Sequence, residues 1–160
     1  MSTVLADSKG MPRRKHVAKA LAYITQADKL LVFRKPESPD AGVQIPGGSV
    51  EPGEALEVAA LREAQEETGL VGLVVQSYLG SAEYALKVDV GRPHLRHFFH
   101  LVYTGATPAR WEHVEAKALP ATPLRFQLWW EPLASVRLDW EMDHYLAHLK
   151  QKLERVQPRS

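Results

Sequence analysis

The amino-acid sequence predicts an α/β protein in which a mixed β-sheet is covered by helices. Segments of strand type lie on both sides of one helical stretch at 55–68, and a second helical stretch closes the chain. The length of 160 residues is typical of one domain that buries a substantial core. We therefore expect a single domain over 16–155, preceded by a flexible basic arm over 1–15 and followed by a tail over 156–160.

The first half of the chain is expected to hold three strands and a helix. Strands at 17–25 and 29–34 flank a short turn, and a loop rich in Pro, Asp and Gly leads to a brief strand at 43–46. In the helical stretch, apolar and small side chains fall roughly on one face: Leu56, Ala59, Ala60, Ala64 and Thr68. Gly69 follows them, and a glycine in the left-handed conformation commonly ends a helix.

The second half is expected to contain four more strands, at 70–80, 83–90, 95–105 and 126–133. The stretch at 107–125 contains three prolines, and we interpret it as a functional loop because it is too long for a plain connection. The closing stretch at 140–156 places an apolar stripe on one helical face: Met142, Tyr145, Leu146, Leu149 and Leu153.

The bulk composition excludes several classes of protein. A formal net charge of +1 gives no bulk attraction to nucleic acid, and no basic stripe carries interleaved aromatic residues, so no nucleic-acid partner is expected. The absence of cysteine removes disulfides, thiolate metal sites and a cysteine nucleophile. No apolar run approaches the roughly 18 residues of a membrane span, and the first residues lack the apolar region of a signal peptide. We expect a soluble, cytoplasmic protein.

Negative charge is concentrated in one short part of the chain. Six glutamates lie within twenty-four positions, and on a helix Glu63, Glu66 and Glu67 project to adjoining positions. Glu54 lies just upstream, and pairing of Arg62 with Glu66 still leaves a surplus of negative charge. A solvated helix face is one explanation. The other is a cation site, for which oxygen ligands without nearby cysteine or histidine favour Mg²⁺ or Mn²⁺.

The loop before this helix supports the second explanation. Its "PGG" and "EPGE" segments let the backbone turn tightly and expose carbonyl oxygens near the start of the helix. Carboxylates and a backbone carbonyl around Mg²⁺ make a site that could hold the phosphates of a substrate.

The loop and helix together resemble the Nudix box, the signature of the Nudix hydrolases. The family pattern is Gly-x5-Glu-x7-Arg-Glu-U-x-Glu-Glu-x-Gly-U, where U is aliphatic. All its fixed positions agree with this chain, with the small Ala64 at an aliphatic position: Gly48, Glu54, Arg62, Glu63, Glu66, Glu67 and Gly69. Weaker similarity covers most of the chain. The resemblance implies an α/β/α sandwich with a mixed sheet, and metal-dependent hydrolysis of a nucleoside diphosphate linked to another group.

The resemblance also implies roles for individual residues. The implied ligands of Mg²⁺ or Mn²⁺ lie on the helix and in the loop beside it: Glu63, Glu66, Glu67 and a backbone carbonyl of Gly48 or Gly47. Glu63 would also help to activate water. Arg62 would orient the glutamates through salt bridges, and Glu54 would stabilise the loop or join the metal shell through water.

Residues outside the box are candidates for substrate contact. They lie in or near strands or in the long stretch at 107–125: Arg34, Tyr84, Glu112 and Glu115. Tyr84 could stack on a base, whereas solvated charge is the alternative for the other three. His94, His97 and His100 are spaced by three but lie in a strand, where His97 points away from the other two, and we interpret them as ordinary strand residues.

The partner is expected to be a small-molecule nucleotide. The residues that Nudix hydrolases of ADP-ribose, dinucleoside polyphosphates and coenzyme A tend to carry outside the box are mostly missing. By elimination, the expected substrate is a (deoxy)nucleoside triphosphate, plain or oxidised, and the expected products are the monophosphate and pyrophosphate. The alternatives within the enzyme class are hydrolysis of the other three substrates and hydrolysis of RNA 5′ ends. A nucleotide sensor without turnover is the alternative outside it, although the chain keeps every glutamate of the box.

Overall fold

The computed structural model describes residues 16–85, 92–115 and 123–156. The strands are β1 (Val17–Gln26), β2 (Lys29–Arg34), β3 (Gly47–Ser49), β4 (Val74–Tyr84), β5 (His94–Val102), β6 (Arg110–Glu115) and β7 (Leu124–Pro132). The helices are α1 (Leu56–Thr68), α2 (Leu146–Val156) and a short 3₁₀ helix, η1 (Pro39–Ala41). The arm over 1–15 and nearly all of the tail over 156–160 lie outside the described residues.

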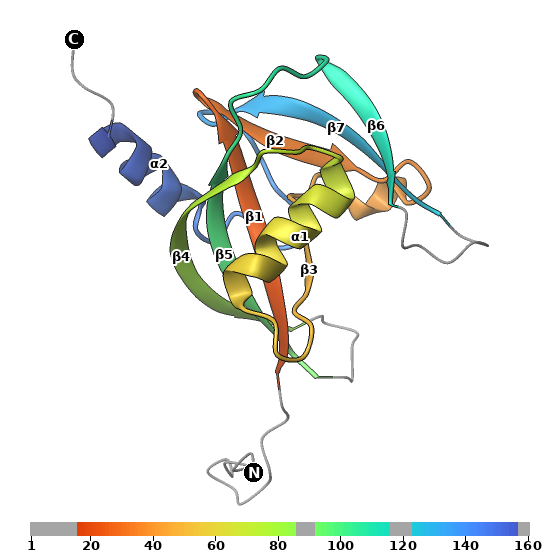
Figure 1. Ribbon diagram of the computed structural model, residues 1–160, viewed down its shortest axis with the longest axis vertical. Coiled ribbons are helices and arrows are strands. Elements are labelled where there is room, and N and C mark those ends of the chain that lie inside the picture. Colours follow the sequence, from red (N-terminus) through yellow and green to blue (C-terminus); the bar gives the residue numbers. More distant parts are fainter. Residues whose placement is uncertain (1–15, 86–91, 116–122, 157–160) are drawn as a thin grey trace, which may run out of the picture.

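The described strands form one mixed sheet, in the order β4-β5-β1-β2-β7-β6, and β3 pairs with β1 off this path. β1 runs parallel to β5 and antiparallel to β2 and β3. Parallel strands require a crossover connection, and here it contains α1. Figure 1 shows α1 lying across one face of the sheet, with α2 on the other side. The predicted α/β/α sandwich with a mixed sheet is confirmed.

Alternation along β1 divides the buried core in two. Ala20 and Ala22 belong to the cluster that packs against α1, whereas Leu21 and Tyr23 belong to the cluster that includes α2. The buried apolar face of α1 consists of small side chains: Ala59, Ala60 and Ala64. These alanines allow the helix backbone to approach the sheet closely. The acidic side of α1 is thereby held near β3, and the sheet positions the glutamates.

The end of α1 agrees with the sequence analysis. Gly69 has φ of 74° in the left-handed region, and its N–H donates to the carbonyl of Gln65 at 2.9 Å. A Cβ at this position would also meet the ring of His113 on β6. Glycine therefore serves both the helix end and the close approach of the neighbouring strand.

The prediction of a loop over 107–125 is wrong in its first part, because residues 110–115 form β6. This strand pairs antiparallel with β7, from Arg110 opposite Trp129 to Glu115 opposite Leu124. The side chain of Trp111 anchors it, since the indole N–H donates to the carbonyl of Thr68 at 3.0 Å. The strand carries charged residues on an exposed face, so its sequence lacks the apolar alternation by which strands are recognised.

Three other boundaries differ from expectation. β4 continues to Tyr84 with two irregularities in its register, so the expected break between strands at 70–80 and 83–90 is absent, and most of the second expected strand lies outside the described residues. The brief strand at 43–46 is a single bridge between Phe33 and Gln44, and β3 begins after it. The closing helix begins only at Leu146, because Trp140 and Glu141 have positive φ values of 61° and 57° that an α-helix does not allow. No helix within the described ranges is long and apolar enough to cross a membrane.

The strand histidines of β5 behave as expected of core and surface residues. His100 is buried, and its Nε2 lies 2.7 Å from the hydroxyl oxygen of Thr25 on β1. Burial lowers the pKa of His100 to about 4, from the 6.5 of an unperturbed histidine. His97 lies on the other face of the strand, within hydrogen-bond distance of the Tyr78 hydroxyl.

This pKa predicts a specific loss of stability in acid. Above pH 6.5 His100 is neutral whether the chain is folded or unfolded. As the pH falls toward 4, the unfolded chain gains a proton there that the folded chain does not, so the free energy of unfolding falls. Between pH 7 and pH 4 the free energy of unfolding should fall by about 2–3 kcal/mol less in His100→Gln than in the parent. Urea denaturation at both pH values measures it, with exposed His148→Gln as the control; equal falls in parent and His100→Gln would contradict the prediction.

Candidate active site

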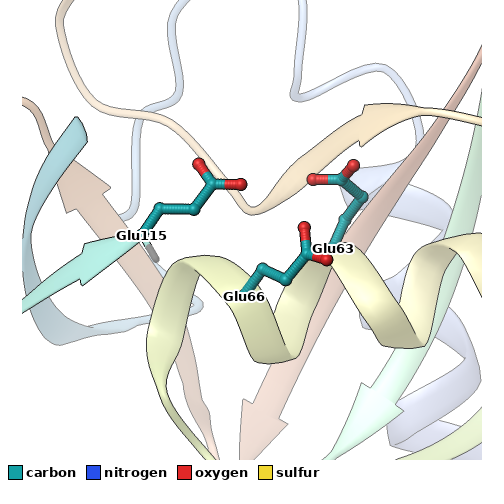
Figure 2. A group of neighbouring side chains, drawn as sticks. All are labelled: Glu63, Glu66 and Glu115. Atoms are coloured by element: carbon teal, nitrogen blue, oxygen red, sulfur yellow. The ribbon is translucent and has the colours of Figure 1, made fainter. Parts of the chain in front are cut away.

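The acidic face of α1 meets the end of β6. Glu63, Glu66 and Glu115 each offer a carboxylate oxygen, and the three oxygens lie within 4.8 Å of one another. Figure 2 shows the two helix side chains and the strand side chain converging on one space from different elements. We call these three residues the acidic cluster. Glu115, a candidate for substrate contact by sequence, is thus brought to the box glutamates, which the sequence spacing did not show.

Arg62 supports the cluster from one side. Its Nε and Nη2 donate to the two oxygens of Glu54 at 2.7 and 2.9 Å. Its Nη1 donates to Glu63 Oε1 at 2.9 Å and, more distantly, to Glu66 Oε2 at 3.4 Å. Nη2 also donates to the carbonyl of Ser49 at 3.0 Å. These hydrogen bonds, chiefly the pair to Glu54, raise the pKa of Arg62, so its charge is permanent. The guanidinium joins the loop, β3 and α1.

Glu67 lies apart from the acidic cluster. Its side chain is 5% exposed, and its Oε1 accepts a hydrogen bond from the N–H of Gly47 at 2.8 Å. Burial raises the pKa of Glu67 well above its usual range. The carboxyl therefore ties α1 to β3 directly behind the two glycines of that strand.

The pKa values within the cluster reflect crowding and burial. Burial raises the pKa of Glu63, although Arg62 opposes the shift. Burial also raises the pKa of Glu115, and Glu63 and Glu66 raise it further by repulsion. Removing water from carboxylates and placing them together favours a proton or a cation between them. A donor set of clustered carboxylate oxygens suits a hard divalent cation such as Mg²⁺.

Gly48 makes room for this cluster. A Cβ built on Gly48 would lie less than 3.0 Å from the carboxylate of Glu63. A Cβ on Gly47 would press against the backbone of Ala20 and the side chain of Leu21 on β1. β3 therefore has no side chain on either side where it passes the cluster.

A pocket of about 320 Å³ lies next to this strand. Its walls come from β1, β2, β3, β5 and α1, with one residue from before α2. Basic side chains outnumber the acidic one, Glu67, among its polar lining: Lys19, Lys35, His94 and Arg96. Apolar walls complete it: Leu21, Phe33, Ile45 and Met142. We call it the basic pocket.

The remaining sequence candidates are distributed over two places. Tyr84 packs under Arg96 beside the basic pocket, with the guanidinium carbon 3.7 Å from its ring centroid. Arg34 and Glu112 line a separate pocket of about 480 Å³ around Trp129, away from the acidic cluster. The sequence reasoning did not identify Lys19 or Arg96. The available signal was a charged residue within each of two otherwise buried strands.

The fold and the cluster define a class of protein, an α/β/α sandwich with an acidic loop–helix–loop against its sheet. The NUDIX domain model matches residues 15–151, so the chain belongs to the NUDIX family.

The chain is also similar to individual proteins, whose named activities differ from one another. The chain is 32% identical over 115 residues to the NAD-capped RNA hydrolase NudC of Stutzerimonas stutzeri. The aligned region covers 66% of this chain and 38% of NudC. It is 43% identical over 67 residues to an ADP-ribose pyrophosphatase of Methanocaldococcus jannaschii. That alignment covers 41% of this chain and 39% of the pyrophosphatase. The crystal structure of a MutT NUDIX hydrolase from Burkholderia pseudomallei superposes with a TM-score of 0.61 at 19% identity. The superposition covers 84% of this chain and 98% of the hydrolase. The chain thus spans about two fifths of the length of these curated relatives.

Proposed function

We propose that the protein hydrolyses a diphosphate linkage in a nucleoside diphosphate derivative with the help of Mg²⁺ or Mn²⁺. The observation that carries the proposal is the acidic cluster, which is supported by Arg62 and contacts Gly48, a residue that lines the basic pocket. A solvated helix face would not explain why a third carboxylate arrives from β6, or why two of the three have raised pKa values.

The residues of the cluster fit a divalent cation. Glu63, Glu66 and Glu115 would hold it, with Glu67 and a carbonyl of Gly48 or Gly47 as further ligands. When bound, such a cation supplies a Lewis acid that neutralises the diphosphate and makes a bound water more acidic. Glu115 is an addition to the ligands that the box implies.

The other residues have roles that follow from their contacts. Arg62 binds Glu63 through Oε1 and leaves Oε2 available to accept a proton from the attacking water. The raised pKa of Glu63 makes its carboxylate a stronger base than an exposed glutamate, which supports this role. Glu54 holds Arg62 in place through two hydrogen bonds, so it acts as a positioning residue.

A (deoxy)nucleoside triphosphate is the proposed substrate, cleaved to the monophosphate and pyrophosphate. The basic pocket supports a polyanionic substrate, since its cationic side chains exceed its carboxylates. The relatives are named for activity on NAD-capped RNA and on ADP-ribose, so those compounds are necessary members of any test.

Hydrolysis of a substrate panel tests the proposal. The panel contains nucleoside triphosphates, oxidised deoxynucleotides, ADP-ribose, dinucleoside polyphosphates, coenzyme A and NAD-capped RNA, each with Mg²⁺ and with Mn²⁺. We expect the highest kcat/KM for a nucleoside triphosphate, and ¹⁸O from labelled water in one product. Preference for another member would overturn the substrate and keep the reaction class. No hydrolysis of any member, with binding retained, would instead indicate a nucleotide sensor.

A further inference from the structure

Arg96 is a buried cation that the proposed hydrolysis does not use. It lies on β5, is 6% exposed and lines the basic pocket. The face of Tyr84 supports its guanidinium, and its Nη1 donates a hydrogen bond to the carbonyl of Trp140. A buried guanidinium requires acceptors for five N–H groups, and these two contacts supply one carbonyl and one aromatic face.

No salt bridge in the described part of the chain neutralises this charge, although Glu141 attracts it electrostatically. Among the residues that the structure describes, no Asp or Glu lies within the 4.0 Å of a salt bridge to Arg96. No fully buried side-chain nitrogen in the described part lacks a hydrogen-bond partner. The remaining N–H groups of Arg96 therefore retain access to the pocket instead of being sealed in protein. Unpaired buried charge is costly, so its presence beside an open pocket calls for an external anion.

Lys19 adds a second positive charge beside Arg96, because the two residues lie opposite each other in the pairing of β1 with β5 and both line the basic pocket. Its Nζ donates to the hydroxyl oxygen of Ser49 at 2.7 Å. Burial lowers the pKa of Lys19, and both Glu63 on one side and Arg96 on the other act on it electrostatically. Both cations thus line one pocket, and the charge of Lys19 is close enough to Glu63 of the acidic cluster to interact with it.

We propose that Arg96 and Lys19 form a phosphate subsite, which binds a phosphate group of the substrate other than the diphosphate held at the acidic cluster. This inference rests on the proposed function and specifies its substrate as one with a third phosphate. A neutral base would leave the Arg96 charge unbalanced, whereas a phosphate oxygen accepts charge-assisted hydrogen bonds from a guanidinium. Arg96 is accordingly a specificity-determining residue.

Binding of inorganic phosphate to the protein in EDTA is the first test. A single phosphate can occupy the subsite without contacting the acidic cluster, so the assay requires neither metal nor turnover. We expect Arg96→Gln to weaken phosphate binding by about tenfold and Lys19→Gln by about fivefold. Arg137→Gln is the matched control, because it removes an exposed arginine that does not line the basic pocket. Its affinity should equal that of the parent.

Steady-state kinetics with a nucleoside triphosphate and the matching diphosphate is the second test. Arg96→Gln should lower kcat/KM about tenfold for the triphosphate and less than about twofold for the diphosphate. If Arg96→Gln fails to fold, Lys19→Gln decides with the same two measurements. Equal phosphate affinity in parent and folded variants, or equal losses for both nucleotides, would overturn the subsite. Arg96-dependent phosphate binding without hydrolysis of any nucleotide would support the subsite while refuting the proposed hydrolase.

Discussion

Replacing Glu67 with Gln is expected to lower kcat/KM on the order of 100-fold, with little loss of stability. The carboxamide oxygen of glutamine can still accept the hydrogen bond that Gly47 donates, so the link between α1 and β3 remains. The change removes one negative charge from the cation site. Because the Glu67 side chain is buried, bulk solvent does not compensate for the loss of that charge. Steady-state assays over a range of Mg²⁺ and Mn²⁺ concentrations measure the effect.

Two companion variants make this result interpretable. Glu66→Gln removes a carboxylate of the acidic cluster itself and should cause a loss of similar size. Glu57→Gln makes the same chemical change at an exposed position in the first turn of α1, and its activity should equal that of the parent. If Glu67→Gln retains activity within about threefold at saturating metal, Glu67 is not a ligand and serves only to hold β3.

Arg62→Ala is expected to affect both stability and metal binding. Arg62 is the shared partner of Glu54, Glu63 and Glu66, so its loss leaves these carboxylates facing one another. Their repulsion and the lost bond to Ser49 should reduce the free energy of unfolding by about 1–2 kcal/mol, which corresponds to a fall in Tm of a few degrees. We also expect Mn²⁺ affinity to fall by about tenfold, because the ligands lose their orientation.

Arg62→Lys separates charge from geometry. Lysine keeps the positive charge but cannot bind both oxygens of Glu54 and reach Glu63 at once, so we expect a partial recovery of Tm and little recovery of activity. Thermal melts and Mn²⁺ titrations of the three proteins give the comparison. Unchanged Tm and metal affinity in Arg62→Ala, with only the KM raised, would place Arg62 in direct contact with the substrate.

Much of the fold could be predicted because its signals are local. The helix α1, its end at Gly69 and the strands β1 and β2 each follow from the spacing of neighbouring residues. β6 could not be predicted, because its exposed face carries charged residues and because Trp111 anchors it to Thr68, which lies 43 positions earlier in the chain. The start of α2 was misplaced because Trp140 and Glu141 have positive φ values, in a segment where Trp140 bonds to the distant residues Ala41 and Arg96.

The candidate site shows the same division between local and distant information. Glu63 and Glu66 are neighbours on one helix, so their proximity follows from helical periodicity alone. Glu115 joins them only because β6 packs beside α1, which no spacing in the sequence expresses. Arg96 and Lys19 face each other across the pairing of β5 with β1, another relation that appears only in the folded chain.

Two consecutive glycines in β3, Gly47 and Gly48, have a consequence for how the protein could evolve. Substitution there is obstructed on both sides, by Glu63 and by β1. The pocket walls beyond the glycines are ordinary side chains on β1, on β5 and before α2, such as Lys19, Arg96 and Met142. They can be exchanged without displacing a carboxylate of the acidic cluster. Hydrolytic chemistry and substrate choice are therefore separable traits, and new specificities are best sought by randomising the pocket walls while α1 and β3 are left intact.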